Sequence, residues 1–136
     1  MYYLKFKYLL LFLIFSCVSS PHLFEEYKLL TNNSKKYWLI THINNHRVKI
    51  NKTIWMFDKK RNYIQYTYND SLTIINSGDE VYVNRFEILN KKRILLNRYQ
   101  NHLIYLDKDS LVISNDNYSY ILKPIQLNSS TTILRD

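Results

Sequence analysis

The chain has 136 residues with one cysteine, one glycine and no alanine, and its formal net charge is +8. A single cysteine excludes an internal disulfide, and without a cluster of cysteines and histidines a structural zinc site is not expected. One glycine excludes phosphate-cradling loops and the Gly-x-Ser-x-Gly nucleophile elbow. We therefore predict that the protein is not an enzyme and has no catalytic residue, metal or cofactor.

The N-terminus has the layout of a secretory signal peptide. Lys5 and Lys7 supply a positive start, an unbroken apolar run extends from Tyr8 to Phe15, and short side chains follow. About 20 apolar residues are needed to cross a bilayer, so this shorter run is expected to be cleaved off and not to remain as a span. We assign residues 1–16 to the signal peptide.

Two cleavage sites compete at the end of this run. The segment Ile14–Cys17 resembles the lipobox of bacterial lipoproteins, whose cysteine is acylated and becomes the first mature residue, although Phe15 stands where a small residue is usual. Cleavage after Ser20 by ordinary signal peptidase is the alternative, and it leaves a proline directly after the cut. In a third interpretation Cys17 is only one more apolar residue of the run. We favour lipidation of Cys17, which predicts an exported protein anchored to the outer membrane, on its periplasmic or surface face.

Residues 17–35 are predicted to hold the lipidated cysteine, a linker and one short helix. The helix spans Pro21–Leu30, because proline is favoured at a helix start and apolar side chains recur there at helical spacing. The turn formers of Thr31–Ser34 end it.

Between residues 36 and 126 short apolar runs alternate with polar turns at roughly 8–12-residue spacing, which is typical of an antiparallel sandwich or barrel. Tyrosine and the β-branched residues in these runs favour strands. The expected strands are Tyr37–Ile43, Lys49–Phe57, Tyr63–Tyr68, Leu72–Ile75, Val81–Leu89, Ile94–Tyr99, Leu103–Leu106, Leu111–Ser114 and Tyr118–Ile125.

The connections between these runs are short and rich in Asn and Asp, which tolerate the positive φ of tight hairpins. None is long enough for a crossover helix, so parallel βαβ units are excluded. A small sandwich and an up-and-down barrel of about eight strands remain, and we favour the barrel because closure removes exposed sheet edges. The last residues, 127–136, are predicted to be a polar tail.

Five short segments follow one another in order: Leu29–Thr31, Lys36–Ile40, Trp55–Asp58, Leu72–Ile74 and Leu103–Ile113. This order resembles the lipocalin-like lipoproteins of Bacteroidetes-type bacteria, in which a lipidated cysteine and a linker precede a first strand with a tryptophan. The resemblance implies a ligand-binding barrel or a barrel of unknown role. Lys36 stands where lipocalins usually carry glycine, and the resemblance makes Lys123 the candidate for a basic residue that packs over Trp38.

Large apolar side chains alternate along three predicted strands, and residues two apart on a strand share one face. If these faces point inward, they line a cavity or form a solid core, since a barrel of about eight strands just holds side chains or one small ligand. We predict that they bind a small hydrophobic or amphipathic molecule. The alternative is a solid core in an envelope module for protein interaction or assembly. The candidate ligand-binding residues are Trp38, Ile40, Trp55, Phe57, Tyr66 and Tyr68.

Two other patterns favour ordinary surface roles. His42 and His46 stand four apart, which suits a metal site on a helix, but their surroundings predict strand and turn. The basic runs Lys59–Arg61 and Lys91–Arg93 precede tyrosines, as in barrels that bind single-stranded nucleic acid, yet both fall in predicted turns. Because the signal peptide also predicts export, we expect no nucleic-acid partner. We further expect a monomer that is held at the membrane through Cys17.

Overall fold

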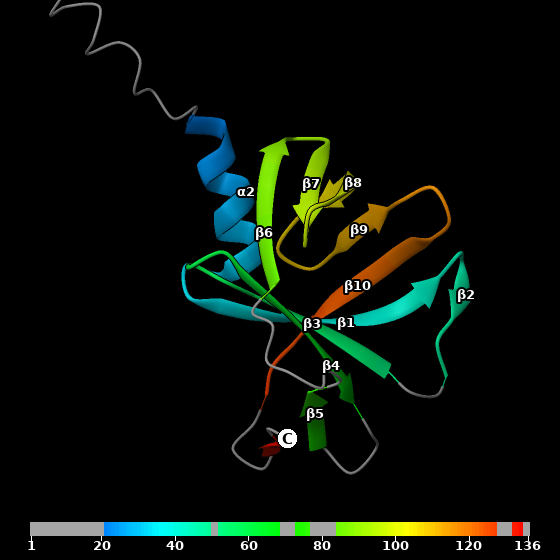
Figure 1. The fold of residues 1–136 in the computed structure, drawn as a ribbon. Coiled ribbons are helices and arrows are strands. Elements are labelled where there is room, and N and C mark those ends of the chain that lie inside the picture. Colours follow the sequence, from blue (N-terminus) through cyan, green and yellow to red (C-terminus); the bar gives the residue numbers. More distant parts are fainter. Residues whose placement is uncertain (1–20, 50–51, 69–72, 77–83, 128–131, 135–136) are drawn as a thin grey trace, which may run out of the picture.

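Figure 1 shows one helix against a strongly curved sheet in the computed structural model, which describes residues 21–49, 52–68, 73–76, 84–127 and 132–134. The predicted signal peptide and Cys17 lie outside the described residues. The described elements are α2 (Pro21–Thr31), β1 (Lys35–Ile43), β2 (His46–Arg47), β3 (Lys52–Asp58), β4 (Asn62–Tyr68), β5 (Thr73–Asn76), β6 (Asn84–Asn90), β7 (Arg93–Leu96), β8 (Tyr99–Leu106), β9 (Leu111–Ser114), β10 (Ser119–Ile125) and β11 (Thr132–Leu134).

The predicted N-terminal helix is confirmed as α2. Asn32 and Asn33 end it with φ angles of 51° and 58°, a left-handed backbone that asparagine tolerates better than most residues. The Asn32 amide still donates to the Lys28 carbonyl oxygen at 2.7 Å, which satisfies one of the free carbonyls of the last turn. The chain then reverses into β1.

Eight strands form a closed antiparallel ring in the order β1, β3, β4, β6, β7, β8, β9 and β10, and β10 pairs back with β1. Each ring strand is hydrogen-bonded to the next ring strand along the chain. β2 and β5 are outside the ring and pair with β1 and β4. The predicted antiparallel all-β class is therefore confirmed. The shortest strand pairing in the ring is between β4 and β6, where only Asn62↔Arg85 and Tyr63↔Asn84 are paired. The later half of β4 pairs with β5 instead.

One predicted strand and its turn were placed wrongly. The run Ile94–Tyr99 was expected to be one strand, but β7 ends at Leu96 and pairs with Tyr99 across a two-residue turn. Asn97 and Arg98 form that turn with φ angles of 48° and 72°, the conformation that matches the twist of a tight hairpin. Asn101, expected in the turn, is instead buried in β8.

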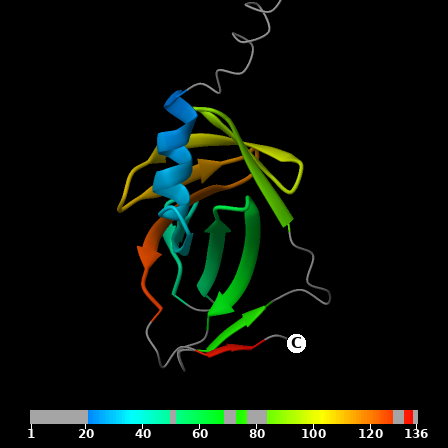
Figure 2. The same ribbon diagram turned by 90° about the vertical axis from the view of Figure 1, so that its left-hand side faces the viewer.

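The predicted polar tail also needs correction. Within residues 127–136, β11 forms a parallel pair with β5, from Thr132↔Thr73 to Leu134↔Ile75. A strand of three residues shows no alternation that a sequence pattern can detect, and it gains its hydrogen bonds from the unpaired edge of β5. Figures 1 and 2 both place the β5–β11 pair at the end of the molecule far from α2.

The interior of the ring is filled by side chains that alternate along its strands, as a period of two requires. α2 covers one end of this interior: Leu30 is fully buried, and the Tyr27 hydroxyl accepts a hydrogen bond from the Ile88 amide at 3.0 Å. The buried residues of this inner cluster come from α2 and from all eight ring strands: Leu30, Trp38, Ile40, Trp55, Phe57, Tyr63, Phe86, Ile88, Ile94, Leu96, Leu103, Leu111, Ile113 and Leu122.

A second apolar cluster lies on the opposite face of β1, β3 and β4. Its buried members are Tyr37, Ile54, Met56 and Tyr66, with Leu127 packed against them. This outer cluster explains why β3 is buried on both faces over four successive residues, a pattern that simple alternation does not predict.

Candidate functional site

The structure divides the predicted binding residues between the two faces of the sheet. Trp38, Ile40, Trp55 and Phe57 belong to the inner cluster and lie together. Tyr66 was expected with them but belongs to the outer cluster, where its ring centroid is 6.4 Å from that of Tyr37. Tyr68 ends β4, and its side chain is outside the described part.

Register explains this correction. Phe57 on β3 pairs with Tyr63 on β4, and Trp55 pairs with Gln65, so the inward face of β4 carries Tyr63 and Gln65. Successive side chains on a strand alternate between faces, so Tyr66 points outward. Tyr63 was not among the predicted binding residues, because its place on the inward face follows from the register of β4 against β3 and not from the sequence of β4.

A series of aromatic contacts runs through the ring from α2. Tyr27 contacts Phe86 with ring centroids 5.7 Å apart, and Phe86 meets Phe57 edge-on at 5.1 Å. Phe57 stacks on Tyr63 at 5.1 Å, and Trp55 meets Tyr63 edge-on at 5.5 Å. The part of the interior beside α2 is therefore occupied by packed rings.

Trp55 continues this series towards solvent. Its ring lies 5.2 Å from Tyr120, and Tyr120 lies 6.0 Å from Tyr118, which is 50% exposed. The Trp55 indole is only 5% exposed, and its Nε1–H has no hydrogen-bond partner in the described part of the chain. A buried donor without an acceptor costs about 1–3 kcal/mol, and native proteins keep few of them. Ile43 pairs with Tyr120 across the sheet, and both are only partly buried against the inner cluster, as is Val48.

Tyr63 gives the interior a measurable response to pH. Burial raises the pKa of its phenol well above the ordinary value, and a hydrogen bond donated by Gln65 Nε2 opposes this rise only in part. The unfolded chain ionises this tyrosine from about pH 10 upward, while the folded chain keeps it neutral. The stability contributed by neutral Tyr63 is therefore complete below about pH 10 and is lost as the pH rises towards the pKa of the folded state.

We expect the Tyr63→Phe variant to lose less stability in alkali than the wild-type chain. One fewer proton is released on unfolding, so the slope of unfolding free energy against pH should be shallower by about 1.4 kcal/mol per pH unit above pH 10. Urea unfolding between pH 8 and pH 12 measures this slope. Identical slopes for the two proteins would show that Tyr63 ionises equally in the folded and unfolded chains.

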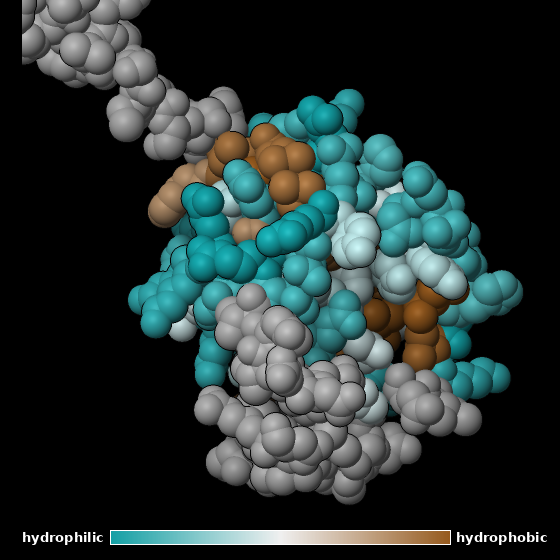
Figure 3. All heavy atoms as spheres, viewed as in Figure 1, coloured by the Kyte–Doolittle hydropathy of each residue, from teal (hydrophilic) through white to brown (hydrophobic). Residues whose placement is uncertain are grey.

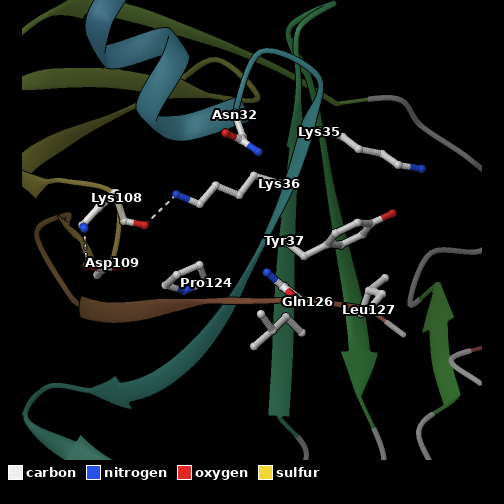
Figure 4. A pocket seen from close by; sticks show the side chains of 10 residues that line it. Asn32, Lys35, Lys36, Tyr37, Lys108, Asp109, Pro124, Gln126 and Leu127 are labelled. Atoms are coloured by element: carbon white, nitrogen blue, oxygen red, sulfur yellow. Dashed lines mark hydrogen bonds and ion pairs between the residues drawn. The ribbon is translucent and has the colours of Figure 1, made fainter. Parts of the chain in front are cut away.

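A groove outside the ring is the second candidate site. It has a volume of about 810 Å³ and lies where the turn after α2 meets β1, the β8–β9 turn and the end of β10 (Figure 4). Lysine side chains form part of its wall, and half-buried apolar side chains form another part. Its lining residues are Asn32, Lys35, Lys36, Tyr37, Lys108, Asp109, Pro124, Ile125, Gln126 and Leu127.

Lys36 is the central cation of this groove. Its Nζ donates to the Leu29 carbonyl oxygen at 3.1 Å and to the Lys108 carbonyl oxygen at 2.8 Å, and it lies 4.0 Å from the ring centroid of Trp38. Burial lowers the pKa of Lys36, while Asp109 and Asp107 act in the opposite direction. A cation over an indole face is attracted by the ring quadrupole. Through this contact and its two hydrogen bonds, Lys36 links β1 to α2 and to the β8–β9 turn.

This position was predicted for another residue. Lys123 was the candidate for a basic side chain over Trp38, but it is exposed, and its Nζ donates to the Ser110 hydroxyl at 3.3 Å. Lys36 takes the position because it stands two residues before Trp38 and therefore shares its face of β1. That spacing was readable in the sequence.

Other candidates from the sequence remain separate from both sites. His42 lies on β1 with its Nδ1 3.1 Å from the Thr41 hydroxyl, and His46 is exposed on β2. In the described segments no three metal-ligating side chains gather, and no helix there is long and apolar enough to span a membrane. Of the basic runs, Lys59 and Lys60 are exposed in a turn.

No protein-family model matches the sequence, and no curated protein or solved structure matches it either.

Proposed function

We propose that this chain is an exported lipoprotein, anchored through Cys17 to the outer membrane, whose lipocalin-like barrel binds a small hydrophobic or amphipathic molecule. It acts as a monomer and catalyses no reaction. Three features support the proposal: the lipobox-like segment Ile14–Cys17, the up-and-down order of eight strands, and a helix that closes one end of the ring. The bound molecule lies on the side of the inner cluster away from α2.

The indole N–H of Trp55, which has no hydrogen-bond partner in the described part of the chain, is the observation that carries this proposal. A ligand with a carbonyl or ether oxygen at Nε1 removes the cost of the unpaired donor, and this gain is available only when the ligand is bound. Tyr120, whose ring lies 5.2 Å from that of Trp55, and its cross-strand partner Ile43 supply apolar contact area beside it. Few precisely placed polar groups in an otherwise apolar pocket are typical of small-molecule sites.

A second candidate is an envelope interaction or assembly module in which the inner cluster is only a scaffold. The exposed apolar side chains favour it: Phe24 is 67% exposed and Ile104 is 62% exposed. Figure 3 shows hydrophobic surface gathered over the start of α2 and the neighbouring β6. Exposed apolar patches on a soluble domain mark surfaces that bind partners.

Binding of 2-decanone, which carries one carbonyl acceptor on an apolar chain, tests the first candidate. We expect the extracted full-length protein to bind it in calorimetry, and the Trp55→Phe variant to bind it about tenfold more weakly, because one hydrogen bond is lost while most apolar area stays. Trp38→Phe is the matched control, because the Trp38 Nε1–H already donates to the Leu30 carbonyl oxygen at 3.0 Å. Decane, which has no acceptor, should not distinguish wild type from Trp55→Phe.

Absence of 2-decanone binding, together with no ligand retained in native mass spectrometry after gentle detergent extraction, would favour the interaction module. Equal losses for Trp55→Phe and Trp38→Phe would place the ligand elsewhere.

A further inference from the structure

We infer that the groove beside α2 is a separate binding site for an amphipathic anion, a carboxylate or phosphate monoester on a short alkyl chain. The groove lies outside the ring, so this inference does not rest on a ligand inside it. Its volume of about 810 Å³ falls within the range of roughly 300–1,000 Å³ that small-molecule sites occupy.

Lys36 has hydrogen-bonding capacity that the protein does not use fully. An ammonium group has three N–H donors, and the carbonyl oxygens of Leu29 and Lys108 accept two of them. The third has no hydrogen-bond acceptor in the described part of the chain, so an anion competes for it only with the Trp38 ring, whose centroid lies 4.0 Å from the Nζ. Both acceptors are neutral, so they orient the ammonium group without cancelling its charge.

The charge around the groove is mainly positive. Its lining includes three lysines and a single acid, Asp109, whose carboxylate lies 3.9 Å from Lys108 Nζ. Within the described ranges no carboxylate lies within 4.0 Å of the Lys36 or Lys35 ammonium group. Nearby Asp107 is turned to other partners, since it accepts hydrogen bonds from the Tyr105 hydroxyl at 2.8 Å and the Asp109 amide at 2.7 Å. Asp109 and Asp107 act on Lys36 only from beyond ion-pair distance, and a partly buried positive charge attracts an anion more strongly than a fully solvated one does.

Apolar side chains form the other wall of the groove. Pro124, Ile125 and Leu127 are half-buried along the end of β10, next to the buried ring of Tyr37. Figure 4 shows Lys36 and Lys108 on one side of the groove, Pro124 beside them, and Leu127 and Tyr37 farther along. A headgroup at Lys36 therefore leaves its alkyl chain over Pro124 and Leu127, which explains why the ligand is amphipathic and not a bare ion.

Calorimetry on the full-length chain in an uncharged detergent tests this site with four probes: octanoate, octyl phosphate, 1-octanol and inorganic phosphate. We expect octanoate or octyl phosphate to bind at least tenfold more tightly than 1-octanol and inorganic phosphate. The better of the two anions identifies a carboxylate or a phosphate headgroup. Lys36→Met keeps an unbranched side chain over Trp38 and removes the charge, so it should weaken binding of the better anion about tenfold.

Two matched variants control for net charge and for the charge at position 36. Lys123→Met removes an exposed lysine of β10 and should leave binding of the anion unchanged. Lys36→Arg keeps the charge and should retain most of the affinity. If Lys36→Met does not fold, Lys35→Met at the groove surface is expected to weaken binding about threefold by loss of one solvated charge.

Three results would overturn the inference. Equal affinity for octanoate and 1-octanol would remove the role of the anion, and equal affinity for inorganic phosphate and octyl phosphate would remove the role of the apolar wall. If Lys123→Met and Lys36→Met weaken binding of the anion equally, the affinity depends on the net charge of the protein and not on the groove. None of these results changes the expected binding of 2-decanone or its dependence on Trp55. Failure of this site and failure of the proposed function are therefore distinguishable.

Discussion

Replacement of Trp38 by alanine is expected to lower the free energy of unfolding by about 4 kcal/mol. Trp38 is fully buried in the inner cluster, and its indole N–H donates to the Leu30 carbonyl oxygen at 3.0 Å. Lys36 packs on the ring from the other side, with its Nζ 4.0 Å from the ring centroid. The variant therefore leaves a large cavity, an unpaired carbonyl at the end of α2 and an ammonium group without its aromatic partner.

Urea denaturation followed by far-UV circular dichroism measures this change. Phe24→Ala is the matched control on α2, because Phe24 is 67% exposed and its truncation should change stability by less than about 0.5 kcal/mol. Trp38→Phe keeps most of the volume but removes the indole N–H, so a loss of about 1–2 kcal/mol is expected. If Trp38→Ala costs no more than Phe24→Ala, α2 does not close the ring in solution.

Replacement of Cys17 by serine is expected to move the protein from the membrane fraction to the soluble exported fraction almost completely. Each methylene of an acyl chain contributes about 0.8 kcal/mol of membrane affinity, so the loss of acylation outweighs any surface contact of the folded part. The hydroxyl of serine is similar in size to the thiol but is not the group that the proposed acylation modifies. The described fold begins at Pro21, so we expect the released protein to remain folded.

Fractionation of cells followed by mass spectrometry of the N-terminal peptide measures both attachment and acylation. Ser16→Ala is the matched control, because alanine is also a small residue directly before the cysteine, and this variant should stay in the membrane fraction. A Cys17→Ser protein that remains membrane-bound would mean that the anchor lies elsewhere, and an unmodified Cys17 peptide in the wild type would favour cleavage after Ser20.

Local chemistry made much of the fold predictable. The run Leu111–Ser114 was predicted with the bounds that β9 has, because turn-forming residues flank it on both sides. In the connection predicted after Tyr37–Ile43, Asn44 and Asn45 adopt φ angles of 49° and 64°, which asparagine tolerates in place of glycine. The helical window at Pro21 depended on spacing of apolar residues within a few turns. Each of these features is decided by neighbours in the chain.

The amino-acid sequence by itself therefore determined most of the element types, most turns and the face shared by Trp38 and Ile40. Only the tertiary structure decided which face of β4 points inward, because that depends on the register of β4 against β3, and a shift of one residue exchanges Tyr63 for Tyr66. It also decided the position of Lys36, whose ammonium group is held by carbonyl oxygens of Leu29 and of Lys108, a residue 72 positions away. Contacts between distant segments are set by packing and closure of the ring, which no local pattern of residues encodes.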